Sequence, residues 1–463
     1  MKITDILEQI PDWKGRLSMI KTDSRTSGQI PLKLIDLYYN RKHEILNKPV
    51  KISNGKTIDQ ARLVLDFQYR IVETAIAFLL GGGISVSNSD KEDDEKLKIV
   101  REALTAMKYD SRSKECARSL FVETMSAKLF YVNGMNTEAG DTAIKKEDWK
   151  IGCMVLSRKH LDEFYAHFDD TGDMDGFLRV YMGTILDGGR RKEQERIELY
   201  TAEKIYKGFR SGGDYEVKEE KNMFEKIPVV YYQQPLPEWE RVQTLIDQYE
   251  KSFSKSVDVN AYFASPAAKI KGALKDMPTK EEAGKVFQLE GKQGSDGKWE
   301  YGDVEYLTWD DRPEALKLEF DMLEKYIYSF SQTADISFYS MIEAKLGNIS
   351  GFALKMLTLD PMLKAENKKE IFTENTLREM SVIQTMLKTI GKLNEPVDLS
   401  INFKSIIPND LKELLTNLST AVEGKPVMSQ KTAIRLNPLV TNVDQEIADV
   451  EAENGLEAGT SNL

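Results

Sequence analysis

Three adjacent residues, Gly55, Lys56 and Thr57, match the end of a phosphate-binding loop. In such a loop the backbone cradles the phosphates of a nucleotide, the lysine contacts them and the hydroxyl binds magnesium. The motif also needs a glycine five residues before Gly55, and this chain has Val50 there. Gly81–Gly83 follows a helical pattern instead of a strand, and no lysine with a hydroxyl residue comes after it. The sequence therefore contains no complete nucleotide-binding loop.

An acidic run, Asp169–Gly176, is similar to a calcium-binding loop because four of its residues are aspartates. In that loop a glycine occupies the sixth position and a bidentate glutamate the twelfth. Aligning Gly176 with the glycine puts Thr171 first and Met182 where the glutamate belongs. We interpret the run as a surface turn.

The remaining candidate ligands and nucleophiles are scattered. His43, His160 and His167 have no cysteine or second histidine at metal-ligand spacing, which favours ordinary core or surface roles. Ser350, in the run GNISG, lies one residue away from the position of a nucleophile elbow and has no identifiable histidine or aspartate partner. We predict no catalytic residue, no metal site and no cofactor. The many carboxylates leave an unrecognised hydrolase or nucleotide-binding enzyme as an alternative.

Composition excludes several classes of protein. The 463 residues carry a formal net charge of −11, which argues against a basic face that grips nucleic acid. The longest apolar run, Ala75–Leu80, is far shorter than the ~20 residues of a membrane-spanning helix, and the N-terminus lacks the apolar core of a signal peptide. Two cysteines, Cys116 and Cys153, give no disulfide framework. We expect synthesis in a reducing cytosol and no membrane association.

Periodicity and turn signals predict an α+β chain that is mainly α. A helical pattern over about Asp59–Leu80 ends at three glycines, the usual helix stop. From about Phe130 to Tyr232, short aromatic-rich segments alternate with Gly and Asp turns, as antiparallel strands do. Pro235 and Pro237 end this β-rich portion and open a helix.

Two helices separated by an acidic, strand-like insert at 273–311 come next. The first carries one apolar face, made of Val242, Ile246, Tyr249 and Phe253. The second has apolar residues alternately three and four positions apart, the spacing of a packing seam: Leu316, Phe320, Leu323, Ile327, Phe330 and Ala334. A second stripe consists of Leu318, Met322 and Tyr326. Such a helix either contacts neighbouring copies of the chain or is buried within its own core.

A loop, Ser337–Ser350, precedes a long helical pattern that begins with Ser350 as N-cap and continues to about Ile390. Pro361 lies within this pattern. A proline removes one backbone hydrogen bond and clashes with the carbonyl four residues earlier, here Leu357, so we expect a bend. After Arg435 the chain has six carboxylates and no lysine or arginine, which predicts a flexible acidic tail.

The run GNISGFALKM at 347–356 resembles the portal proteins of tailed bacteriophages, specifically the siphophage-type group. The resemblance rests on Gly347, Asn348, Ser350, Gly351, Ala353 and Leu354. Three further segments are similar in the same order, namely Ile71–Ile84, Ile227–Ala264 and Ile407–Glu446. Each segment alone is degenerate, and their shared order over about residues 30–450 supports the resemblance.

The resemblance implies a portal-type architecture with long stem helices. Its parts would be a β-rich wing at 1–235, stem helices at 236–272 and 312–336, a small α/β clip at 273–311, a tunnel loop at 337–350, a proline-bent wing helix at 351–391, and a helical crown with the acidic tail at 392–463. Lys345, Gly347, Asn348, Ser350 and Gly351 would lie at the DNA channel, with Lys345 making transient phosphate contacts. The stem seam of Leu316, Phe320, Leu323, Ile327 and Phe330 would join subunits, and Pro361 would kink the helix.

The function implied is a ring, typically of twelve subunits, at one capsid vertex, for packaging, retention and ejection of the genome. Twelve helices side by side at ~8–10 Å leave a channel roughly 25 Å wide, enough for a duplex. An acidic channel repels phosphate, so double-stranded DNA would slide through it without sequence preference. The implied partners are the terminase large subunit, head–tail adaptors, and the major capsid and scaffolding proteins. The protein would reside in the virion, and in the host cytoplasm during assembly. A coiled-coil scaffold without a pore stays as a further alternative.

Overall fold

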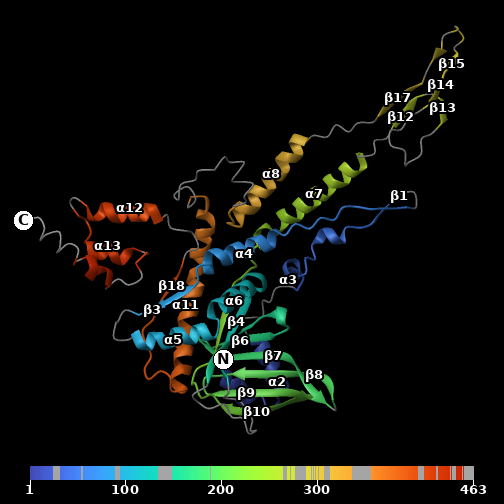
Figure 1. The fold of residues 1–463 in the computed structure, drawn as a ribbon. Helices are drawn as coiled ribbons and strands as arrows, with labels where there is room; N and C mark the ends of the chain where they lie inside the picture. The colour runs from blue at the N-terminus through green and yellow to red at the C-terminus, as the bar shows by residue number, and fades with distance from the viewer. Residues whose placement is uncertain are drawn as a thin grey trace, which may run out of the picture.

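The computed structural model describes a set of segments with gaps between them: residues 1–23, 32–53, 56–88, 94–133, 149–187, 189–263, 268–271, 273–276, 288–293, 295, 297, 299–300, 302–306, 313–335, 356–404, 411–423, 426–437, 439–440, 445–450 and 452. As predicted, the chain is α+β with more helix than strand. The elements form a layered body, from which one helical arm and one C-terminal helical unit extend (Figure 1).

The centre of the body is a three-stranded antiparallel sheet in the order β11-β4-β5. Its strands are β4 (Met125–Asn133), β5 (Lys150–Leu156) and β11 (Val229–Gln233). One face of this sheet packs on helices α4 (Phe67–Leu80), α5 (Asp94–Ala106), α6 (Tyr109–Glu123) and α11 (Leu359–Thr389). Because side chains alternate along a strand, Phe130 and Val132 of β4 enter this core while Ala127 and Leu129 enter the core on the other face.

That other face lies against a five-stranded antiparallel sheet in the order β10-β9-β8-β7-β6. The strands are β6 (Glu163–Phe168), β7 (Met174–Asp187), β8 (Arg190–Tyr200), β9 (Lys204–Ser211) and β10 (Asp214–Lys221). Phe164 and Phe177 stack between the two sheets, with ring centroids 6.0 Å apart. The outer face is covered by α1 (Ile3–Gln9) and α2 (Trp13–Asp23). The order of layers is therefore helices, small sheet, large sheet and N-terminal helices.

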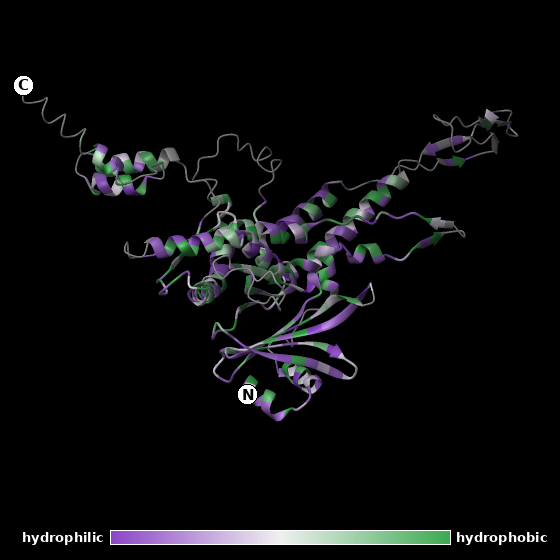
Figure 2. Cartoon of the chain, turned by 60° about the horizontal axis from the view of Figure 1, so that its bottom comes forward, coloured by the Kyte–Doolittle hydropathy of each residue, from purple (hydrophilic) through white to green (hydrophobic). Residues whose placement is uncertain are grey.

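The arm consists of two helices, α7 (Gln243–Phe263) and α8 (Pro313–Phe330), with a strand-rich tip at its end (Figure 1). The tip contains β12 (Ala268–Lys271), β13 (Ala273–Asp276), β14 (Gln288–Glu290), β15 (Lys292–Gln293), β16 (Trp299–Glu300) and β17 (Asp303–Tyr306). Because α7 ends at Phe263 and β12 pairs with β17, the tip begins earlier in the sequence than the predicted boundary at residue 272. Both helices carry hydrophobic and hydrophilic residues, as amphipathic helices do (Figure 2).

An irregular segment, residues 59–66, runs along α7 and is here called the strap. The backbone N–H groups of Ala61, Leu63 and Leu65 donate to the side chains of Asp258 (2.6 Å), Ser254 (3.0 Å) and Glu250 (2.8 Å), respectively. Four helical residues rise ~6 Å, which is close to the length of two extended residues, so every second strap residue meets the next helical turn. The predicted helix over Asp59–Leu80 is therefore wrong for its first eight residues, because α4 begins only at Phe67.

The strap connects to the outer elements of the arm and body: α3 (Leu32–Tyr39), the 3-10 turn η2 (Glu44–Asn47) and the hairpin of β1 (Lys51–Ser53) and β2 (Lys56–Ile58). Near the C-terminus, β18 (Ser400–Phe403) pairs with β3 (Ile84–Ser87), which fixes the end of α11 to the body. Two short helices, α12 (Leu411–Val422) and α13 (Gln430–Leu436), lie beyond it. Two short 3-10 turns are η5 (Arg158–His160) and η6 (Glu240–Val242), and residues 445–450 are also helical.

Candidate functional site

The two arm helices pack through aromatic rings. Phe320 of α8 lies 5.3 Å from Tyr249 and 5.9 Å from Phe253, both on α7, measured between ring centroids. Beside them the Ser252 hydroxyl donates to Glu319 at 2.7 Å. The apolar face predicted for α7 is thus used to hold α8 within the same chain.

The seam predicted to join subunits therefore packs mainly inside the subunit. Ile327 is 0% exposed and belongs to the main core, so it offers no surface to a neighbour, which corrects the role predicted for it. Leu316, Phe320 and Leu323 are half-buried along the side of α8 that packs on α7. Phe330 is the exception, with 60% of its surface exposed.

The second stripe of α8 is the exposed one. Leu318, Met322, Tyr326 and Phe330 follow one another at spacings of four and are between 39% and 60% exposed. The rings of Tyr326 and Phe330 stack on each other, with centroids 5.5 Å apart and planes 8° apart. These four residues are called the α8 stripe below, and they form a continuous exposed apolar row along α8.

A second apolar surface lies at the start of α11. Its members are all exposed: Met356, Leu357, Leu359, Met362 and Leu363, called the α11 patch below. The α8 stripe and the α11 patch precede and follow residues 336–355 in the sequence. Lys345, Gly347, Asn348, Ser350 and Gly351 of the predicted tunnel loop fall in that interval and lie outside the described residues.

The chain on both sides of this interval is anchored by a buried ionic cluster. Lys364, in the second turn of α11, donates to the carbonyl oxygen of Ser331 at the end of α8 (2.9 Å) and pairs with Glu238 (2.8 Å). Glu238 also binds Lys368 at 2.5 Å. Burial tends to raise the pKa of Glu238, but the two ammonium groups outweigh it and hold that pKa below its usual range. Burial lowers the pKa of Lys364 despite Glu238.

Replacing Glu238 with Gln should loosen both ends of this interval, because the buried ammonium of Lys364 and the partly buried ammonium of Lys368 lose their shared carboxylate. We expect a loss of ~1–3 kcal/mol in local stability, seen as faster hydrogen exchange in residues 331–335 and the first turns of α11. Glu366→Gln is the matched control, since Glu366 pairs with Lys369 on the same helix but is 70% exposed. Equal effects of the two variants would contradict the anchoring role.

Pro361 does not bend a continuous helix. Residues 356–357 are helical, Thr358 leaves the helical conformation (φ −101°, ψ 11°), and α11 then begins at Leu359. Pro361 therefore occupies the first turn, where the missing N–H has no helical partner to lose. The predicted kink is corrected to a helix interruption three residues earlier.

A buried ion pair that sequence reasoning missed holds α11 in the body. Lys128 of β4 and Glu379 of α11 are 3.0 Å apart and almost fully buried. Tyr232 donates to Glu379 at 2.7 Å, Tyr109 also bonds it, and Lys128 donates to Ser113 at 2.9 Å. Burial alone would lower the pKa of Lys128, but Glu379 raises it. The available signal was a lysine in the middle of the apolar strand sequence MSAKLFYV.

The motif fragments rejected on spacing have structural roles. Lys56 and Thr57 belong to β2 of a hairpin. The strap follows β2 directly, where a phosphate-binding loop would continue into a helix. Asp169 closes the turn between β6 and β7 by accepting hydrogen bonds from Thr171 and Asp173.

Across the described segments, no group of three or more histidine, cysteine or acidic side chains could hold a metal ion. Cys116 and Cys153 are buried free thiols, and burial raises the pKa of each to about 12.

Among the described helices none is long and apolar enough to cross a membrane. The exposed apolar surfaces described above lie on an elongated α+β chain (Figure 1).

The family model described as "Phage portal protein, SPP1 Gp6-like" matches residues 28–459. The chain therefore belongs to this family of phage portal proteins, which confirms the resemblance inferred from GNISGFALKM. No curated protein matches the sequence.

Solved structures similar to this chain include particle necks. One, "Neck of empty GTA particle computed with C6 symmetry", is 11% identical, covers 82% of this chain and 91% of its own, and has a TM-score of 0.42. Another, "Virion of native gene transfer agent (GTA) particle", is 12% identical, covers 81% of this chain and 90% of its own, and has a TM-score of 0.39.

Proposed function

We propose that the protein forms the portal ring of a phage particle, a channel at one capsid vertex through which double-stranded DNA is packaged, retained and ejected. The family match supports the role of portal protein. One structural observation carries the ring: the subunit exposes two unlike apolar surfaces, the α8 stripe and the α11 patch. Two different surfaces on one subunit allow head-to-tail contacts, which close into a ring when the rotation between subunits permits.

In this proposal the α8 stripe of one subunit packs on the α11 patch of the next, and twelve subunits close the ring. Twelve is favoured because twelve packed arm helices leave a channel roughly 25 Å wide, whereas eight leave about half that width. The net charge of −11 keeps phosphate groups from adhering to the channel, so DNA passes without being gripped. Lys345, Gly347, Asn348, Ser350 and Gly351, at and directly after the tunnel loop 337–350, stay the predicted contacts with passing DNA.

The strand-rich tip of the arm is proposed to dock the terminase large subunit during packaging and the head–tail adaptors afterwards. The body, with its two stacked sheets, would contact the major capsid and scaffolding proteins. The motor is a separate protein in this proposal, because Gly55–Thr57 is only part of a phosphate-binding loop.

Native mass spectrometry and negative-stain imaging of the purified chain test the ring. We expect a particle of about twelve times the 52.7 kDa chain mass, with a central hole. A protein that stays monomeric at micromolar concentration, or that forms an elongated dimer, would overturn the proposal. An elongated dimer would favour a scaffold without a pore.

A further inference from the structure

The first 23 residues form a unit that lies outside the portal family match, which begins at residue 28. Helices α1 and α2 cover the outer face of the five-stranded sheet and share a small core with it, separate from the two cores of the body. The helices contribute Ile3, Ile6, Leu17 and Ile20, and the sheet contributes Leu178, Val180, Ile197, Leu199 and Tyr206. This N-terminal hairpin, residues 3–23, therefore hides an apolar face of the sheet.

The hairpin is organised internally by Arg16. Its guanidinium donates to the carbonyl oxygens of Ile10 (2.6 Å) and Leu7 (2.7 Å), and it lies 4.7 Å from the ring centroid of Trp13. Trp13 in turn packs on Tyr206 of the sheet, 5.3 Å between ring centroids. Arg16 therefore ties the start of α2 to the end of α1.

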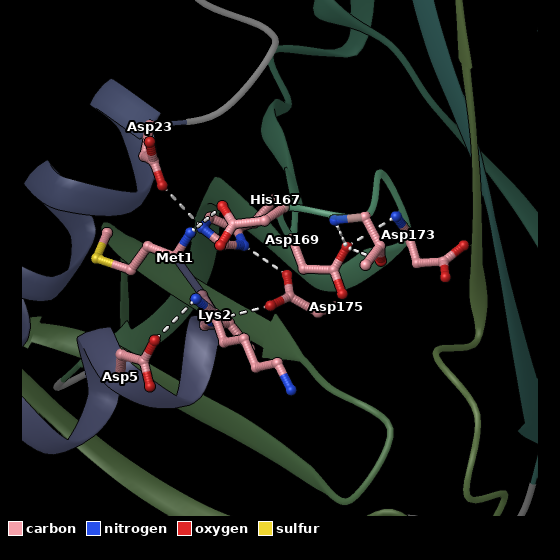
Figure 3. A network of polar contacts seen from close by, with 11 residues as sticks. Met1, Lys2, Asp5, Asp23, His167, Asp169, Asp173 and Asp175 are labelled. Carbon is pink, nitrogen blue, oxygen red and sulfur yellow. Dashed lines mark hydrogen bonds and ion pairs between the residues drawn. The ribbon is translucent and has the colours of Figure 1, made fainter.

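Several polar contacts hold the hairpin on the sheet, and one of them is the ion pair between Lys21 of α2 and Glu163 of β6 at 3.1 Å. Asp175 accepts from the backbone N–H of Ile3 at 2.7 Å, which fixes the start of α1. Asp214 accepts from the backbone N–H groups of Trp13 (3.3 Å) and Lys14 (2.8 Å), which caps α2. At the far end of α2, Asp23 contacts His167 of β6 (Figure 3).

His167 is the contact that depends on a proton. Its side chain is 0% exposed, with Nδ1 2.5 Å from Asp175 and Nε2 3.1 Å from Asp23. A neutral imidazole donates from one nitrogen only, so both contacts are satisfied only by the imidazolium. Met1, Asp5, Asp169 and Asp173 lie around this contact (Figure 3). The ammonium of Met1 binds Asp170 at 2.6 Å. Burial lowers the pKa of His167, but Asp175 and Asp23 outweigh it and raise that pKa above its ordinary value.

We propose that His167 is a proton-dependent latch: its imidazolium ties α2 to β6 and β7, and loss of the proton releases the N-terminal hairpin and uncovers the apolar face of the sheet. The stabilisation is complete below the ordinary histidine pKa of ~6.5 and is lost as the pH rises through the raised pKa of the folded state. The hairpin is therefore held more tightly in mildly acidic solution and opens more often under alkaline conditions. This latch operates whether or not the chain forms a ring.

Hydrogen exchange of the full chain, measured at pH 6, 7.5 and 9 and corrected for the intrinsic exchange rate, tests the latch. We expect the protection of α2 amides to fall roughly tenfold or more across this range. In His167→Gln, α2 should be poorly protected at every pH, with no pH dependence. His160→Gln is the matched control, because His160 is exposed on η5, and it should behave as the unmodified chain.

Asp23→Asn offers a second variant if His167→Gln does not fold, since Asp23 is 42% exposed and its loss should weaken the pH dependence without disturbing the sheet. Three results would overturn the latch. They are constant protection of α2 from pH 6 to 9, a pH dependence that survives in His167→Gln or is undiminished in Asp23→Asn, and a simultaneous loss of protection in β7 and β8.

Discussion

Met322→Asp should give a folded protein that no longer assembles into rings. Met322 lies in the middle of the α8 stripe and is 44% exposed in the subunit, so an aspartate there is solvated as long as the chain is alone. In the proposed ring the same position is covered by the α11 patch of the next subunit. A carboxylate buried there without a partner costs several kcal/mol, and each ~1.4 kcal/mol is a factor of ten in the association constant. Because every contact in the ring is the same, the penalty occurs at each of them.

Met223→Asp is the control for this variant. It makes the same chemical change at a methionine that is 58% exposed, in the turn before β11 and away from both apolar surfaces. Mass photometry and negative-stain images should show rings for Met223→Asp and single subunits for Met322→Asp. Circular dichroism confirms that both variants fold. Rings from Met322→Asp would show that the α8 stripe is not the subunit contact.

Lys128→Met should lower the melting temperature more than any other single change considered above. The substitution removes the cation from a fully buried pair and leaves the Glu379 carboxylate with hydroxyl donors only. Breaking a buried pair in this way costs about 3–5 kcal/mol, which lowers Tm by roughly 10 °C in a body of this size. Lys226→Met is the matched control, because Lys226 is exposed and reaches the same helix through Ser381 at 2.6 Å.

A double variant distinguishes the ion pair from simple packing. Lys128→Met combined with Glu379→Gln removes both charges, so it should recover part of the loss measured for Lys128→Met alone. Differential scanning calorimetry of the unmodified chain, Lys128→Met, Glu379→Gln and the double variant provides the comparison. Additive losses in the double variant would mean that the side chains act through packing and not through their charges.

The fold of the β-rich portion could be predicted because its signals are local. Strands β6 to β9 follow aromatic-rich segments of the sequence, and each pairs with the next strand along the chain. The strap could not be predicted in the same way. Residues 59–66 have helical spacing of apolar residues, but their N–H groups are bound by α7, almost two hundred residues later in the sequence. Long-range pairing of this kind leaves no local pattern.

The subunit contact on α8 stays a prediction, and the structure shows which of its residues are exposed. Periodicity identified two stripes on α8, yet it cannot say which one faces α7 and which one faces outward. The structure assigns the Ile327 side to the core and the Met322 side to the surface. The anchors Glu238 and Lys364 lie 126 positions apart, so charge patterning along the sequence gives no sign of their contact.

The strap determines how the arm can move. Three of its backbone N–H groups are bound by side chains on successive turns of α7. Sliding the helix along its axis therefore breaks all three hydrogen bonds together. They can form again only after the helix has moved by a full turn. Small axial displacements are therefore opposed, whereas swinging the tip loads the bonds one after another. If the proposed packaging motor pushes on the tip, α7 would resist displacement along its axis more strongly than it resists bending. Its load would reach the body at the inner end, where Glu250 also contacts the buried His43 at 2.7 Å.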